Sequence, residues 1–221
     1  MKPKQKSHDD SSTNSTATNL EKRKQLKKEL YKDATGLFDK FESYKLVYED
    51  KARNYTARQI EDDEGNTITL AEMFIPDFTE ENWKYWHDDP TGVNDRMTPR
   101  LTVTLVDSED GFNTYNYQLR MPLFLATRYT VTTFYFYEDK ETGWRTFIDS
   151  SKGNKDIEKR LKEDGTLEKS FVEAFMFFNM AQARPYEGGM QLRMSAKLDI
   201  GGTIPNIVKK LIYKKMTNLL M

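Results

Sequence analysis

Four polar side chains stand within otherwise apolar segments of this 221-residue chain and are its first candidates for chemistry. They are Arg120, Arg128, Glu173 and Asn179. An unpaired buried charge is costly, so any of these groups that lies inside the protein must be paired or must contact a polar ligand. The pattern favours solvent-exposed positions at strand ends for the two arginines. For Glu173 and Asn179, an inward and an outward position fit equally well.

Metal and thiol chemistry find little support. His87 precedes Asp88 and Asp89 and lies near Asp95, but a metal site there needs a further, distant ligand that the sequence does not show. A loop that caps the end of a helix explains this cluster better. The chain has no cysteine, which excludes disulfides, thiolate metal sites and a cysteine nucleophile. We therefore predict that the protein uses no cofactor.

The segments that carry these polar residues are unusually apolar. Residues 171–180 are apolar on both faces, and residues 130–137 are similar. An antiparallel strand usually has one wet face, so these strands are either central and covered on both sides or line something larger than a packed core. Ordinary core packing explains them as well. Flexible methionines that suit an irregular apolar wall are Met176, Met180, Met190 and Met194.

The clearest pattern lies near the C-terminus, where apolar and polar residues alternate over residues 190–200. This period of two predicts a strand with one apolar and one wet face. Gly201-Gly202 ends the strand, and Thr203 can cap a helix that follows. The apolar residues of 204–221 fall at helical spacing, which predicts an amphipathic closing helix.

The remaining pattern is typical of an α+β fold. Residues 1–18 are almost entirely polar and are predicted to be a disordered tail. A capping box at residues 18–21 predicts the start of an N-terminal helix with a basic exposed side. Residues 19–221 are predicted to form one domain, whose strands are joined by hairpin-sized turns into an antiparallel sheet. The expected strands are 51–60, 67–75, 100–106, 112–121, 127–138, 144–148, 170–184 and 190–200.

Composition narrows the class of partner. The 34 lysines and arginines nearly balance the 35 aspartates and glutamates, and this net charge of −1 does not suggest a nucleic-acid-binding protein. No apolar run is long enough for a transmembrane helix, and no apolar segment follows the basic start as it would in a signal peptide. We therefore expect a cytoplasmic protein with no nucleic-acid partner.

Several short segments resemble StAR-related lipid-transfer (START) domains. Residues 199–206, Asp-Ile-Gly-Gly-Thr-Ile-Pro-Asn, are similar to the family's junction between the last strand and the last helix. Residues 121–123, followed by Arg-Tyr-Thr-Val at 128–131, are similar to its proline and its Arg-Asp-Phe-Val strand start. Residues 83–89 resemble its tryptophan–aspartate helix end. Tyr129 replaces the family's aspartate, and the terminal helix is somewhat short. The order of elements is similar over residues 20–221.

The resemblance implies a helix-grip fold, in which a curved antiparallel sheet wraps a C-terminal amphipathic helix, with a further helix at the N-terminus. It implies a protein that is not an enzyme, that holds one lipid in an internal apolar tunnel and carries it between membranes through transient contact with their surfaces. The C-terminal helix would gate this tunnel, hinged at Gly201-Gly202. The implied lipid-binding residues are Arg120, Arg128, Phe134, Glu173, Phe175, Phe177, Met190, Met194, Leu198, Ile207, Val208 and Leu211.

Several points stay open at the level of sequence. A phospholipid is weakly favoured, because aromatic residues and arginines on the strands could hold a phosphate or a choline. Basic residues of the first and last helices could meet anionic head groups or form an ordinary solvated face. An enzyme of the helix-grip superfamily, a hydrolase or cyclase acting on an apolar substrate, would need a base from Glu173, Tyr115 or Tyr117. An interaction module would instead fill the pocket with its own side chains.

Overall fold

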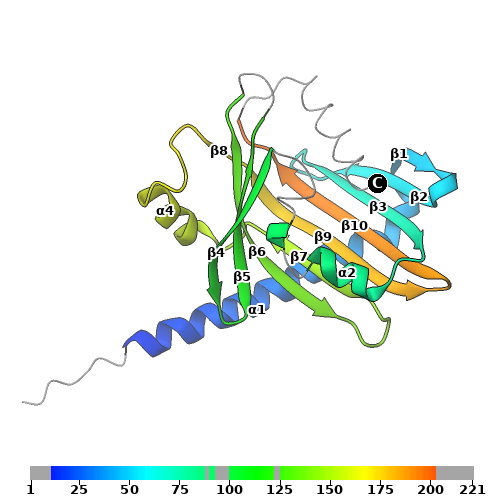
Figure 1. Cartoon of the computed structure of the whole chain (residues 1–221), viewed down its shortest axis with the longest axis horizontal. Coiled ribbons are helices and arrows are strands. Elements are labelled where there is room, and N and C mark those ends of the chain that lie inside the picture. Colours follow the sequence, from blue (N-terminus) through cyan, green and yellow to red (C-terminus); the bar gives the residue numbers. More distant parts are fainter. Residues whose placement is uncertain (1–10, 88–89, 93–99, 122–124, 203–221) are drawn as a thin grey trace, which may run out of the picture.

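The computed structural model describes residues 11–87, 90–92, 100–121 and 125–202. Ten strands form one sheet with the order β1-β2-β3-β10-β9-β7-β6-β5-β4 (Figure 1). All neighbours in this order pair antiparallel, and the short strand β8 runs parallel to β6. The strands are β1 (Lys45–Asp50), β2 (Tyr55–Glu61), β3 (Thr67–Pro76), β4 (Leu101–Glu109), β5 (Phe112–Leu119), β6 (Arg128–Glu138), β7 (Arg145–Ser150), β8 (Val172–Glu173), β9 (Phe175–Tyr186) and β10 (Gly189–Asp199).

In the described part of the chain, the helices lie at the N-terminus and in three of the strand connections. The long helix α1 begins before the predicted capping box, because a nucleated helix extends at little cost, and residues 11–18 of the predicted tail are therefore helical. No described helix is long and apolar enough to cross a membrane. The helices are α1 (Ser11–Gly36), α2 (Glu80–His87), α4 (Lys155–Glu163) and the short 3-10 helices η1 (Leu37–Ser43), η2 (Lys51–Arg53) and η3 (Pro90–Gly92).

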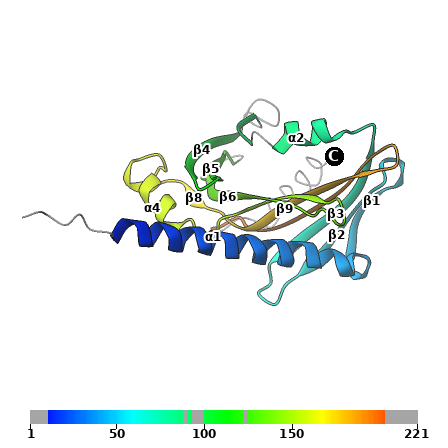
Figure 2. The ribbon, with the colours of Figure 1, turned by 90° about the horizontal axis from the view of Figure 1, so that it is seen from below.

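The helix α1 packs against one face of the sheet, which we call the outer face (Figure 2). Leu30 of α1 and Phe41 of η1 are buried there. The strand residues beneath them alternate along each strand, as one face of a sheet requires. They include Ile68, Leu70, Tyr135, Ile148, Phe178 and Met180. The helix α4 covers the same face beside β6, where Leu161 packs with Tyr129.

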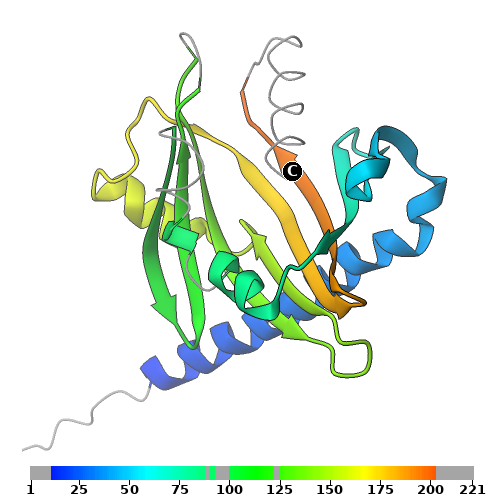
Figure 3. The ribbon, with the colours of Figure 1, turned by 45° about the vertical axis from the view of Figure 1, so that its right-hand side comes forward.

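The sheet curves away from α1, so that its other face, which we call the inner face, is concave (Figures 2 and 3). The helix α2 lies over this face, and its Trp83 ring centroid is 5.8 Å from that of Phe147 on β7. The buried cluster under α2 comprises Tyr55, Ala57, Ala71, Met73, Trp83, Ala181, Ala183, Met190 and Leu192. The predicted α+β class with a curved antiparallel sheet and an N-terminal helix is therefore confirmed. The predicted C-terminal helix lies outside the described residues.

A β-bulge in β9 decides which of its residues face inward. Lys197 of β10 pairs with Phe178 and the next residue pairs with Met176, so Phe177 is an extra residue between them. Phe177 and Phe178 both pack with the outer-face cluster. The alternation restarts beyond the bulge and places Asn179 on the inner face. Strict alternation along residues 171–180 would place Asn179 on the same face as Phe177, and this expectation is wrong because an inserted residue shifts the phase of the strand.

Candidate functional site

The inner face is organised in rows of residues that pair across neighbouring strands. One row is apolar and runs from β6 to β2. Phe136, at the β6 end of this row, is 46% exposed, although its ring centroid lies 5.0 Å from that of Phe147. The row consists of Phe136, Phe147, Ala181, Met194, Ala71 and Ala57. The inner face therefore carries a continuous apolar band, part of which is open.

The adjacent row carries polar groups. It begins beside Phe134 of β6 and consists of Asp149, Asn179, Ala196, Thr69 and Gln59. The Asn179 side-chain amide donates a hydrogen bond of 2.8 Å to Asp149 Oδ1. At the far end of the row, the Gln59 amide donates to the Thr69 hydroxyl at 3.2 Å. A narrow polar belt thus crosses an otherwise apolar surface.

Asp149 is the most unusual member of the belt. The residue is buried, and only 4% of its surface is exposed. Burial raises the pKa of Asp149 from the ordinary 3.8 to about 7, although hydrogen bonds from Asn179 and the Thr132 hydroxyl act to lower it. Neutral partners of this kind do not replace the solvation that a carboxylate loses on burial. Asp149 is therefore a carboxyl group that keeps its proton to a much higher pH than an exposed aspartate.

Two hydroxyl-bearing side chains of the inner face lie next to Asp149. Burial raises the pKa of Tyr117 well above its ordinary value, and the neighbouring charge of Asp149 raises it further. Thr132 is fully buried, and its hydroxyl lies close enough to Asp149 to act on the pKa of that carboxyl. The surroundings of Asp149 are thus polar but uncharged.

Arg128, one of the predicted site residues, holds the backbone at the end of β10. The residue is 4% exposed. Its guanidinium donates to three carbonyl oxygens, those of Ala126 at 2.7 Å, Ile200 at 3.1 Å and Gly201 at 3.4 Å. Burial lowers the pKa of Arg128, and the carbonyls supply the hydrogen bonds that a buried cation needs.

The same junction explains the glycine that follows Ile200. Gly201 has a φ of +68°, and a Cβ at this position would lie 1.9 Å from the carbonyl oxygen of Glu173. Its amide also donates to the Asp199 carboxylate at 2.9 Å. Gly201 therefore makes a close backbone contact beside the carbonyls that Arg128 binds, and the hinge at Gly201-Gly202 stays a prediction.

The structure divides the other predicted site residues between the two faces. Phe134, Met194 and Leu198 lie on the inner face with Arg128, and Met190 is buried there under α2. Phe175 and Phe177 lie on the outer face, where their ring centroids are 4.9 Å apart. Residues outside the described part of the chain are Ile207, Val208 and Leu211.

Glu173 and Arg120 also lie away from the inner face. Glu173 accepts a hydrogen bond of 3.0 Å from Lys155 of α4 and pairs with Tyr129, whose side chain packs under the same helix. Arg120 is exposed and borders a pocket of about 500 Å³ with Glu168 and Phe171, beside the connection that follows α4. The inner-face polar belt therefore includes neither of them.

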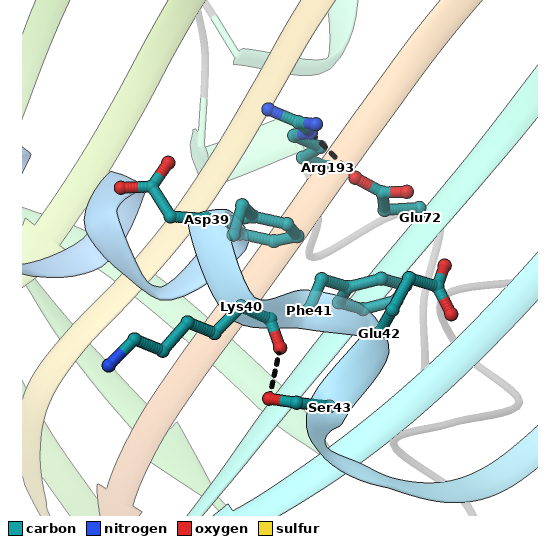
Figure 4. Close-up of a pocket in the computed structure, with 8 residues that line it drawn as sticks. Asp39, Lys40, Phe41, Glu42, Ser43, Glu72 and Arg193 are labelled. Atoms are coloured by element: carbon teal, nitrogen blue, oxygen red, sulfur yellow. Dashed lines mark hydrogen bonds and ion pairs between the residues drawn. The ribbon is translucent and has the colours of Figure 1, made fainter.

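A second pocket, of about 540 Å³, lies on the outer face between η1 and strands β3 and β10 (Figure 4). Arg193 donates to Glu72 there at 2.7 Å and stacks over Phe38 at 5.1 Å. Phe41 lines the pocket nearby. Paired charges and aromatic stacking already satisfy these groups, so this pocket offers little to an apolar ligand.

Sequence reasoning missed Asp149 and Thr132. The predicted strand ends at Ile148, so Asp149 lies one residue outside it. In the structure the strand continues to Ser150 and includes Asp149, which no apolar–polar alternation at residues 147–149 reveals. Thr132 was counted among ordinary strand residues, and only its burial sets it apart.

Comparison with solved structures identifies the fold. The human StAR-related lipid transfer protein 5 superposes with a TM-score of 0.70 at 12% identity, over 88% of this chain and 90% of that one. The chain has the START fold. Human STARD10 gives a TM-score of 0.64 at 14% identity, over 85% of this chain and 77% of its own. The START-domain resemblance seen in the sequence is confirmed at the level of the fold.

A bacterial START protein extends the comparison. The STAR-related lipid transfer protein from Xanthomonas axonopodis gives a TM-score of 0.55 at 14% identity, over 73% of this chain and 85% of its own. No family model matches the sequence, and no curated protein matches it significantly. The START fold is thus evident in the backbone and only faintly in the sequence.

Proposed function

We propose that this protein binds a single lipid on the inner face of its sheet and carries it between membranes. The observation that supports this most is the apolar band that crosses the concave face from β6 to β2. Such a surface gains about 0.8 kcal/mol for each CH₂ group that it removes from water, on the order of 12 kcal/mol for a 16-carbon tail. The START fold, shared with proteins named for lipid transfer, fits the same activity.

The proposed lipid contacts follow from the face of the sheet on which each residue lies. Phe134, Met194 and Leu198 would contact the lipid chain, and Met190 would support the wall from beneath α2. Arg128 would act indirectly, by holding the end of β10. Ile207, Val208 and Leu211 stay predictions, because they lie outside the described residues. Glu173, Phe175, Phe177 and Arg120 lie away from the inner face and are not among the proposed contacts. Gating by the C-terminal helix also stays a prediction.

A role as a non-enzymatic carrier in the cytoplasm, in transient contact with membranes, completes this proposal.

An enzyme acting on an apolar substrate is the second candidate, because Asp149 is a buried carboxyl with a pKa of about 7 and could serve as a general base. Glu173, the base considered from the sequence, is ion-paired with Lys155. Incubation with a lipid mixture followed by product analysis separates the two. A carrier returns the lipid unchanged, whereas an enzyme returns a product that Asp149→Asn no longer forms.

Native mass spectrometry of the purified protein tests the proposed binding. The expected result is one lipid molecule per chain. Ala196→Trp places a large ring in the middle of the inner face, between Asn179 and Thr69, and should abolish the bound mass. Thr104→Trp, at an exposed outer-face position of the edge strand β4, is the matched control and should retain it. A protein that is empty and takes up no lipid from vesicles would contradict the proposal.

A further inference from the structure

The polar belt of the inner face contains an acid but no available cation. Asp149 accepts a hydrogen bond of 2.8 Å from the Asn179 amide, and the Thr132 hydroxyl lies beside its carboxyl. The residues paired with this row are apolar, since Phe134 pairs with Asp149 and Ala196 pairs with Asn179. A ligand group placed at this belt therefore meets a carboxyl, an amide and a hydroxyl.

The inner-face positions of β6, β7, β9 and β10 carry two cationic residues, and both are already engaged. Arg128 donates to three backbone carbonyls. Arg145 forms ion pairs with Glu80 of α2 at 2.6 Å and with Glu138 at 3.2 Å. A phosphate at the belt would thus lose its hydration, face Asp149 and find no free positive charge on these strands. Such an arrangement is strongly unfavourable.

An uncharged polar group of a ligand, unlike a phosphate, fits the polar belt. A protonated carboxyl can donate a hydrogen bond, and an ionised one can accept, so Asp149 can serve a hydroxyl in either state. The buried Thr132 hydroxyl lies beside the Asp149 carboxyl, and a hydroxyl can both donate and accept hydrogen bonds. A ligand group that both donates and accepts would satisfy Thr132 and Asp149 together.

We infer that Asp149, Asn179 and Thr132 hold an uncharged polar group of the lipid, a hydroxyl or an amide, and that the belt rejects a phosphate head group. This inference rests on the proposed function, and it departs from the phospholipid weakly favoured by the sequence. Tyr115 packs edge-on against Phe134 with ring centroids 5.2 Å apart, and this aromatic pair borders the belt on the β6 side. The preferred ligand is then a lipid such as a diacylglycerol, a ceramide or a sterol.

A competition experiment with the full chain tests this inference. The protein is incubated with phosphatidylcholine vesicles that contain smaller amounts of diacylglycerol, ceramide and cholesterol, then separated from them, and its bound lipids are extracted and quantified by mass spectrometry. The wild-type protein should enrich at least one of the uncharged lipids over phosphatidylcholine by about ten-fold or more relative to the vesicles. Asp149→Asn keeps a neutral hydrogen-bonding group and should retain this enrichment.

Asp149→Leu removes hydrogen bonding at similar volume. It should lose most of the enrichment while total bound lipid changes less than about two-fold, because the apolar band is intact. Thermal unfolding of each variant shows that it is folded. Enrichment of phosphatidylcholine by the wild-type protein would overturn the inference, and so would unchanged selectivity in Asp149→Leu. Either result leaves the proposed lipid binding standing, whereas a wild-type protein that takes up no lipid overturns the proposed function itself.

Discussion

Two buried carboxyl groups lie on opposite faces of the sheet and are treated differently. Glu158 of α4, on the outer side, accepts a hydrogen bond from the Tyr129 hydroxyl at 2.7 Å, another from Lys162, and pairs with Lys155 at 3.6 Å. Burial alone would raise the pKa of Glu158, but these partners lower it below the ordinary value. Asp149, on the inner face, has an amide as its partner and a pKa raised to about 7.

This difference in partners indicates which of the two carboxyl groups stabilises the folded protein. Glu158 ties α4 to β6 and is stabilised as an anion by its partners, so its burial contributes to stability. Asp149 is left without a cation in a low-dielectric setting, so its ionisation works against the folded state. A group retained at such a cost is more easily explained by a ligand than by packing. Substitutions at four residues test this difference between the two carboxyl groups and the two faces.

The largest expected effect is a pH dependence of stability that belongs to Asp149. Because the folded pKa is raised from 3.8 to about 7, its neutral form favours folding fully below pH 3.8, and this advantage is lost as pH rises through 7. The shift corresponds to on the order of 4 kcal/mol. Asp149→Asn should therefore be more stable than the wild-type protein at pH 8 and should lack this loss between pH 4 and 8, measured by urea unfolding across about that range. An identical pH profile in both proteins would contradict the assignment.

Arg128 is a buried cation that can be compared with these two buried carboxyl groups. Its hydrogen bonds all go to backbone carbonyls. Arg128→Met leaves the carbonyls of Ala126, Ile200 and Gly201 without this donor and should cost about 3 kcal/mol in urea unfolding. Arg120→Met changes an exposed arginine and is the control, expected to remain within about 0.5 kcal/mol. Equal effects of the two substitutions would show that Arg128 does not hold the junction.

Glu158→Ala should cost about 2 kcal/mol at pH 7.5, less than a fully buried ion pair, because Lys155 and Lys162 are largely exposed. The pKa of the Glu158 carboxyl is lowered in the folded protein. Its contribution to the free energy of unfolding is therefore present above the ordinary pKa of glutamate and is lost as pH falls through the folded pKa. As pH falls, the wild-type protein should therefore lose stability relative to Glu158→Gln, whereas it should gain stability relative to Asp149→Asn. Urea unfolding measured from neutral to acidic pH tests this, and a wild-type protein that gains stability relative to Glu158→Gln in acid would contradict it.

The smallest effect is expected at Glu173, which sequence reasoning placed among the lipid contacts. Its ion pair with Lys155 is partly exposed, so Glu173→Gln should change stability by less than about 0.5 kcal/mol. Lipid binding measured by native mass spectrometry should also be unchanged. Loss of bound lipid in this variant would show that the outer side takes part and would remove the distinction between the faces.

The sequence predicts much of the fold, because alternation and turns are local signals. The β10 strand follows its predicted alternation from Met190 to Leu198 and needs no correction. The strand β1 was missed, since its half-exposed edge residues show no clear alternation. The START-like junction at residues 199–202 also corresponds to a real constraint, the close contact of Gly201 with Glu173.

The site was less predictable, because it depends on strand phase and on partners distant in sequence. The bulge at Phe177 moved Phe175 and Phe177 to the outer face and left Asn179 inside. The partner of Asn179 is Asp149, 30 residues away, and no local pattern reveals that pairing. Arg128 was recognised as unusual, but its backbone carbonyl partners appear only once the chain is folded.

Photo-crosslinking with a lipid that carries a photoreactive group in its acyl chain tests whether the lipid lies on the inner face of the sheet. After irradiation of the complex, tandem mass spectrometry assigns each adduct to a residue. The inner-face assignment predicts adducts at Phe134, Met194 and Leu198. Adducts confined to Phe175 and Phe177, on the outer face of the same sheet, would contradict it.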